Sequence, residues 1–338
     1  MNSRFNYLKT ISSDLPAAIV VYLVALPLCL GIALGSNAPL FSGIIAGIVG
    51  GIVIGTLSGS HKSVSGPAAG LTAIVVVAIT LLPSFEAFLV SVVICGALQL
   101  VLGFARAGVL SDYIPKSVIK GMLAAIGIIL ILKQLPHLVG YDKDFEGDET
   151  FLQPDGQNTF TGIFSALNNI TPVAVLIGAV CIAFQFVWGH FTEKKQGWIK
   201  LIPAPLLVVL LGIAINAIAK AQFPGSGLQS GHLVNIPVAG SAEEFFSFFS
   251  FPDWSALLNK QVWISGVTFA LVASLETLLG IEATDNIDPQ KRITPTNREL
   301  KAQGIGNIIS GFIGGLPLTS VIVRSSANIN AGAKTKMS

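Results

Sequence analysis

The chain has 338 residues, of which 52% are hydrophobic and 11% are charged, and its formal net charge is +2. Soluble domains carry about 25% charged residues, so this composition cannot coat a water-facing surface and excludes a soluble enzyme. The small net charge offers no electrostatic footprint for nucleic acid.

Seven apolar runs are long enough to cross the hydrocarbon core of a membrane, which takes about 20 helical residues. In chain order these predicted spans are 13–33, 40–58, 84–104, 117–134, 171–189, 201–219 and 261–281. Two shorter runs, 67–82 and 318–330, each follow residues rich in Gly, Pro, Ser and Thr. We interpret them as half-helices that begin inside the membrane, with the run 303–315 leading into the second. The sequence therefore predicts an all-α polytopic membrane protein, in which residues 1–338 form one transmembrane domain without a soluble domain.

Basic residues at the span ends predict the orientation, because Lys and Arg near spans are retained in the cytoplasm. On this basis the N-terminus with Arg4 and Lys9, the turn at Lys62 and the loop 291–301 lie on the cytoplasmic side. The loop 137–168 is strongly acidic and belongs outside. We expect a multi-pass protein of a cell membrane, the bacterial inner membrane, with a cytoplasmic N-terminus.

Glycine recurs at every fourth position through the second span. The five positions are Gly43, Gly47, Gly51, Gly55 and Gly59. This spacing predicts one helix face of bare backbone, which another helix can approach closely. We expect burial inside a packed bundle, and a dimerisation stripe is the alternative.

A faint internal repeat relates the two ends of the chain. Gly55 and Gly59 recur as Gly311 and Gly315, at an offset of 256 that lays Pro67–Ala68 over Val323–Arg324. Many transporters consist of two inverted repeats with the substrate between them. We therefore predict a first repeat over about 13–220 and an incomplete second repeat over about 261–338.

The two half-helices predict an anion site. Helices that begin inside the membrane present free N–H groups and a positive dipole end, which together hold negative charge. The residues Ser65, Gly66, Pro67 and Ala68 supply the small side chains and the helix start at the first half-helix, and Val321 to Arg324 contribute N–H groups at the second. A charge inside the membrane is expensive, so Arg324 favours an anionic substrate. The alternatives are that Arg324 snorkels to an interface or pairs structurally with Glu276.

Glu276 is an acid in the middle of an otherwise apolar span. We interpret it as a residue that couples transport to a proton or another cation, and a structural hydrogen bond to the facing half-helix is an equal alternative. We expect Cys29, Cys95 and Cys181 to be inert packing thiols, since they lie in apolar runs. The scattered histidines predict no metal site, and no dinucleotide or P-loop motif predicts a cofactor.

Several motifs resemble the SulP (sulfate permease) family of inorganic anion transporters. They are Asp14–Ala18, Ala25–Pro27, Ser63–Pro67 and the block from Gly304 through Arg324 to Thr335. The resemblance covers nearly the whole chain. It implies seven plus seven inverted segments, of which about ten of 14 are present, with half-helices at segments 3 and 10 and an anion bound between them. Carried over by position, the resemblance implies anion-site residues Leu28, Ile32, Pro67, Ala68, Val323 and Arg324.

The resemblance also implies secondary active transport of a small inorganic anion such as sulfate, bicarbonate or chloride, and we expect a homodimer. Sodium-coupled bicarbonate members have hydroxyl side chains where this chain has Gly280 and Ile322, so we expect proton coupling or exchange rather than sodium. The family usually continues through four more spans and often a STAS domain. Because the sequence ends at Ser338, we expect a truncated chain.

Two other functions stay open at this point. A nucleobase/proton symporter of the same architecture requires an acidic side chain at the second half-helix, where this chain offers Arg324. A fragment that acts as a membrane scaffold without transporting is the other alternative. A membrane enzyme is not expected, because no nucleophile and base are clustered.

Overall fold

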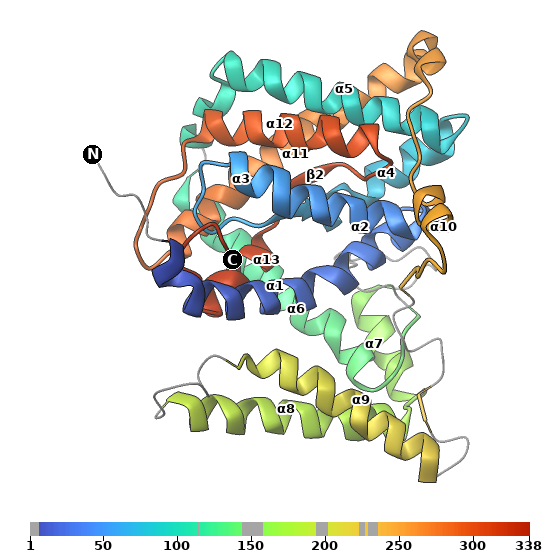
Figure 1. Ribbon diagram of the computed structural model, residues 1–338, viewed down its shortest axis with the longest axis vertical. Coiled ribbons are helices and arrows are strands. Elements are labelled where there is room, and N and C mark those ends of the chain that lie inside the picture. The colour runs from blue at the N-terminus through green and yellow to red at the C-terminus, as the bar shows by residue number, and fades with distance from the viewer. Residues whose placement is uncertain (1–6, 114, 144–157, 194–201, 223–226, 229–235) are drawn as a thin grey trace.

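A computed structural model describes residues 7–113, 115–143, 158–193, 202–222, 227–228 and 236–338 (Figure 1). The predicted cytoplasmic Arg4 and residues 144–157, which contain most of the acidic side chains of the loop 137–168, lie outside these residues. The elements before the acidic loop are α1 (Tyr7–Gly35), α2 (Leu40–Val49), the π turn η1 (Gly50–Ile54), α3 (Gly55–Leu57), β1 (Ser65–Pro67), α4 (Ala69–Leu81), α5 (Phe85–Phe104), the 3-10 helix η2 (Ala107–Tyr113) and α6 (Lys116–Leu138). After it come α7 (Thr159–Leu167), α8 (Pro172–Glu193), α9 (Ala204–Gln222), α10 (Ala242–Ser247), the 3-10 helix η5 (Trp254–Leu258), α11 (Lys260–Ile287), α12 (Thr296–Phe312), β2 (Leu318–Ser320) and α13 (Ile322–Asn330).

The seven predicted spans are confirmed. Within the described residues, seven helices are long and apolar enough to cross a membrane, and each overlaps one of the predicted runs over most of its length. Helix α4 is shorter, as expected for a half-helix. The chain is therefore a multi-pass membrane protein.

Helices α5 and α12 pack against each other along most of their length, above α11 in Figure 1. Glycines allow this approach, since a Cβ built on Gly96 would lie 2.5 Å from Gly304 O. In contrast, α8 and α9 pack mainly on each other at the lower end of the molecule and leave large apolar side chains exposed, among them Phe186 and Leu210. Such exposed apolar surface suits contact with lipid.

The glycine stripe does not form a single contact face. A Cβ on Gly43 would lie 2.0 Å from the carbonyl oxygen of Cys29 in α1, and one on Gly47 would lie 2.8 Å from Cys29 Sγ. A Cβ on Gly51, however, would meet nothing within 4 Å. The π turn η1 interrupts the helix between Gly47 and Gly55, and its wider winding breaks the four-residue period.

The order of a long helix, a second helix, a three-residue strand and a short helix occurs twice, as α1–α2–β1–α4 and α11–α12–β2–α13. The strands start at Ser65 and Leu318, and the short helices at Ala69 and Ile322, so both pairs are 253 positions apart. The predicted offset of 256 is therefore wrong at the half-helices, because the connection before β2 is shorter than the one before β1. The second half-helix also begins at Ile322 rather than 318, because residues 318–320 form β2.

Candidate functional site

Two short strands bring the starts of the half-helices together. Strands β1 and β2 pair antiparallel, with Ser65 opposite Ser320, Gly66 opposite Thr319 and Pro67 opposite Leu318. All six residues are buried. Because α4 follows β1 and α13 follows β2 almost directly, this pairing fixes the two helix starts within one buried region.

Both helix starts present backbone N–H groups that no capping side chain accepts. Ala68 and Val321 precede α4 and α13 in extended conformations, and neither has a side-chain capping hydrogen bond. The first N–H groups of a helix have no partner within that helix and carry the positive end of its dipole. Together these positions suit a small anion better than a cation.

The guanidinium of Arg324 lies across β1. Arg324 is in the first turn of α13, is only 1% exposed, and donates from Nη2 to the carbonyl oxygen of Pro67 at 3.2 Å. A Cβ built on Gly66 would lie 2.1 Å from Arg324 Nη1, so the missing side chain at Gly66 makes room for the guanidinium. Arg324 therefore does not snorkel to an interface, and the structure brings it together with Gly66 and Pro67 as predicted.

Helix α1 adds a side chain that the sequence analysis assigned to packing alone. The thiol of Cys29 lies within hydrogen-bonding reach of the Arg324 guanidinium. Leu28 is half-buried and Ile32 is buried, and both flank Cys29 on a helix that packs against α13, α4 and β1. A uniformly apolar run does not indicate which residue of α1 faces Arg324. The signal in the sequence was the position of Cys29 between Leu28 and Ile32, the two predicted site residues of this helix.

Glu276 of α11 lies at the start of the other half-helix. A Cβ built on Gly70, in the first turn of α4, would be 3.0 Å from Glu276 Oε1 and 3.3 Å from Oε2. A carboxylate at a helix N-terminus is stabilised by the helix dipole. The structure thus brings Glu276 to the facing half-helix, which is the neighbourhood that both sequence interpretations required.

The side chain of Ser65 points away from Arg324. Neighbouring side chains of a strand alternate between its faces, so Gly66 faces Arg324 and Ser65 faces α12. There, Ser65 Oγ accepts a hydrogen bond from Gln303 Nε2 at 2.7 Å. The hydroxyl of Ser65, a predicted site residue, is therefore bonded to α12, and only the backbone of Ser65 lies beside the helix starts.

A row of polar side chains on α12 holds the strands, and sequence analysis missed it. Asn307 Nδ2 donates to Leu318 O at 3.1 Å, and Leu318 N donates to Asn307 Oδ1 at 2.6 Å. The Asn307 side chain thereby satisfies the outer edge of β2 as a further strand would. Glu299, Gln303 and Asn307 are all fully buried, and their four-residue spacing in the sequence could have indicated one helix face.

Gly280 allows β2 to pass close to α11. A Cβ on Gly280 would lie 2.6 Å from Ser320 O, so this position has no room for a hydroxyl side chain. Thr277 Oγ1, one turn earlier, accepts a hydrogen bond from Ser320 N at 3.4 Å. Among the described residues, no group of three or more His, Cys, Asp and Glu side chains is arranged to hold a metal ion.

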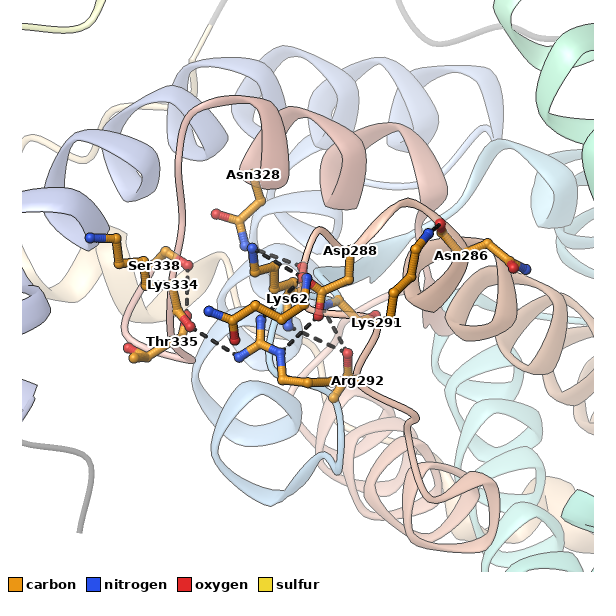
Figure 2. Close-up of polar contacts among 12 residues, drawn as sticks. Lys62, Asn286, Asp288, Lys291, Arg292, Asn328, Lys334, Thr335 and Ser338 are labelled. Carbon is orange, nitrogen blue, oxygen red and sulfur yellow. Dashed lines mark hydrogen bonds and ion pairs between the residues drawn. The ribbon is translucent and has the colours of Figure 1, made fainter. Parts of the chain in front are cut away.

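A second polar cluster joins the loop before β1 to the ends of α11 and α13 (Figure 2). The carboxylate of Asp288 forms two ion pairs, from Oδ1 to Lys62 Nζ at 3.3 Å and from Oδ2 to Arg292 Nε at 2.7 Å. Arg292 Nη1 also donates to Lys334 O at 3.1 Å. Burial alone would raise the pKa of Asp288, but the hydrogen bonds from Arg292 and Gln290 and the nearby charges outweigh it and lower the pKa to about 2. Residues that the charge pattern assigned to one membrane side therefore meet at one end of the fold.

Comparison with known proteins identifies relatives of this arrangement. The family model described as the sulfate permease family matches residues 11–338. The chain is 27% identical to the putative sulfate transporter YvdB of Bacillus subtilis, over 98% of this chain and 58% of that protein. It is 24% identical to the bicarbonate transporter BicA of Picosynechococcus sp., over 98% of this chain and 56% of that protein. The chain thus spans little more than half the length of these two relatives, which are transporters rather than enzymes.

Solved structures show the same fold. The transmembrane domain of a cyanobacterium bicarbonate transporter BicA matches with a TM-score of 0.64 at 21% identity, over 99% of this chain and 80% of that domain. SLC26A9 matches with a TM-score of 0.63 at 17% identity, over 99% of this chain and 52% of that chain. These likenesses confirm the predicted fold class, an all-α polytopic membrane protein with the inverted-repeat transporter fold, to which the structure adds two three-residue strands. Since the sulfate permease model matches nearly every residue, the chain belongs to the sulfate permease family.

Proposed function

We propose that the chain serves in secondary active transport of a small inorganic anion across a membrane. The observation that carries the proposal is the buried Arg324 guanidinium, which lies between the starts of two half-helices that β1 and β2 hold together. One fixed cation and two positive dipole ends favour negative charge in a site without bulk water. The names of the relatives, sulfate and bicarbonate transporters, agree with this chemistry.

The proposed site is built from three elements. Gly66, Pro67 and Ala68 line it from the start of α4, mainly through backbone. Val323 and Arg324 line it from α13, and Leu28 and Ile32 flank it on α1. Backbone N–H groups and a guanidinium bind sulfate, bicarbonate and chloride alike, so the proposed site suits each of these three anions.

We assign coupling to Glu276, which lies against the first turn of α4. Protonation of this carboxylate would change the charge beside the anion site and so link anion binding to the proton gradient. A sodium ion requires several oxygen ligands, and the lack of room at Gly280 removes one candidate position for a hydroxyl ligand. Proton coupling or exchange is therefore preferred over sodium coupling.

The remaining assignments follow from the charge pattern and the family. We propose that the N-terminus and the cluster around Asp288 face the cytoplasm, in the bacterial inner membrane, and that the functional unit is a homodimer. The first repeat would cover about 13–220 and the second would begin at about 261. A nucleobase symporter is not preferred, because the first turn of α13 contributes Arg324 rather than an acid.

The proposal is tested by anion binding to the purified chain in detergent. At constant ionic strength, sulfate, bicarbonate or chloride should raise the thermal stability of the chain in a saturable manner, because a ligand that binds only the folded state stabilises it. Arg324→Leu should abolish this effect, while Lys260→Gln, an exposed cation at the start of α11, should not. A folded Arg324→Leu variant with unchanged anion dependence would contradict the proposed site. Uptake of labelled sulfate and bicarbonate into proteoliposomes, under separate pH and sodium gradients, then identifies substrate and coupling ion.

A further inference from the structure

The thiol of Cys29 is the neutral side chain that approaches Arg324 from α1. Cys29 is 2% exposed and lies within hydrogen-bonding reach of the guanidinium. Arg324 Nη2 also donates a hydrogen bond to the carbonyl oxygen of Pro67. The guanidinium thus interacts with a sulfur on α1 and with a carbonyl oxygen on β1.

The sulfur cannot move away from Arg324 easily. The sulfur packs against α2, where a Cβ on Gly47 would lie 2.8 Å from Cys29 Sγ. A Cβ on Gly43 would lie 2.0 Å from the Cys29 carbonyl oxygen. Two glycines one turn apart therefore let α1 approach α2 so closely that the thiol packs directly against the backbone of α2. The position of the sulfur is set by the packing of two helices and not by a flexible side chain.

The hydrogen-bonding capacity of Arg324 is not used up by these contacts. A guanidinium has five N–H donors, and Arg324 Nε has no hydrogen-bond partner among the described residues although the side chain is 1% exposed. A buried charged donor without a partner is costly, which favours a negatively charged ligand that accepts hydrogen bonds. This unpartnered donor is an independent sign that a ligand binds at Arg324.

The weakness of sulfur as an acceptor gives Cys29 its significance. A thiol accepts hydrogen bonds poorly, whereas a hydroxyl accepts well and a carboxylate forms a strong charge-assisted bond with Arg. A strong acceptor at position 29 would compete with the anion for the same donors. A thiol fills the space beside the guanidinium and leaves its donors to an incoming anion.

We propose that Cys29 is a positioning residue that sets the anion affinity of the site by competing only weakly with the anion for Arg324. The inference rests on the proposed function and assigns α1 a role in it that is separate from coupling at Glu276. Anion affinity should therefore fall as the acceptor strength of residue 29 rises.

The test is a substitution series at position 29, with affinity measured from the sulfate, bicarbonate or chloride dependence of thermal stability. Cys29→Ser should weaken affinity about three- to tenfold, as expected for one added neutral hydrogen bond that the anion must displace. Cys29→Asp should weaken it on the order of 100-fold, because the carboxylate neutralises Arg324. Cys29→Ala should bind at least as tightly as the unmodified chain. A thiol with only a packing role predicts instead that serine leaves affinity unchanged and that alanine lowers stability alone.

A second pair of variants keeps the inference testable should the aspartate variant fail to fold. Gly47→Ala pushes on the Cys29 sulfur and should change anion affinity, whereas Gly51→Ala, in the adjoining π turn η1, meets no atom within 4 Å and should leave the affinity unchanged. Equal affinities across the serine, alanine and Gly47→Ala variants would overturn the role of Cys29, while anion dependence that is still lost in Arg324→Leu would leave the proposed function standing. A wild-type chain without any anion-dependent stabilisation would contradict both.

Discussion

At the scale of single residues, the proposed site depends on the absence of a side chain at Gly66 as much as on the guanidinium of Arg324. Gly66 faces Arg324 and has no side chain, and the guanidinium occupies the space that a Cβ would take. Ser65 and Pro67, its neighbours in β1, have side chains on the other face of the strand. A strand with a larger residue at position 66 would keep Arg324 away from the carbonyl oxygen of Pro67.

Gly66→Ala is therefore expected to disturb the anion site while the helices stay folded. The added methyl group would lie 2.1 Å from Arg324 Nη1, so the guanidinium must shift. We expect at least a tenfold loss of anion affinity, equivalent to about 1.4 kcal/mol, measured by anion-dependent thermal stability. Gly127→Ala, whose methyl group meets no atom within 4 Å, is the matched control. Unchanged affinity in Gly66→Ala would show that Arg324 does not need this space.

The pH dependence of stability is a second prediction at this scale, and it concerns Asp288. Its pKa in the folded chain is about 2, below the ordinary value of 3.8, so its ionised form contributes stability above about pH 4 that is lost as pH falls toward 2. The shift corresponds to about 2 kcal/mol. Asp288→Asn should lose at least this amount at pH 7, since it also leaves the buried Lys62 without its partner. Its stability should also change less than that of the wild type between pH 4 and pH 2 in denaturant unfolding, and parallel pH profiles would refute the assignment.

At the scale of elements, α12 acts as a template for the two strands. Its buried polar face contacts β1 through Gln303 and β2 through Asn307, while Gly304 and Gly311 let the helix lie close to α5. The strands have only three residues each, too few to be stable alone. The side chains of α12 complete their hydrogen bonding and so fix where the half-helices begin.

Asn307→Leu should therefore destabilise the fold strongly. The substitution leaves the N–H and C=O groups of Leu318 buried without partners, at about 1–3 kcal/mol each, so a loss of about 3 kcal/mol or more is expected in unfolding experiments. Thr80→Ala removes an exposed bond to the preceding helical turn and should cost less than about 0.5 kcal/mol. A small effect of Asn307→Leu would mean that β2 holds its position without α12.

The elements also explain how far sequence analysis could go. The spans were predictable because about 20 consecutive apolar residues suffice to identify a crossing helix. Strands β1 and β2 were not predictable, since three residues show no alternation, and the helix starts were misplaced with them. Arg324 was found because a charge within an apolar segment is conspicuous. The contact of Cys29 with Arg324 was missed because an apolar run does not reveal which of its faces turns inward.

At the scale of the whole molecule, the described chain consists of two unequal groups of helices. The hydrogen bonds among α12, β1 and β2 and the polar cluster around Asp288 tie α1–α5 and α11–α13 into one group. Helices α6–α9 form the second group, which touches the first mainly through α6 with α11 and α9 with α1 (Figure 1). A site at the edge of one rigid group can be carried past the other, which is one route to alternating access.

We therefore expect the two groups to change their relative position when an anion binds, while the first group stays rigid. Spin labels at Thr56 and Val101 would measure distances within the first group, and labels at Thr56 and Ile213 would measure distances between the groups. Since the three native thiols are buried, they should remain unlabelled. Electron–electron resonance should give the same narrow distribution for the first pair with and without anion, and a shifted or broadened distribution for the second. Equal behaviour of the two pairs under saturating anion would mean that the chain binds without rearrangement, and that transport requires a motion outside these helices.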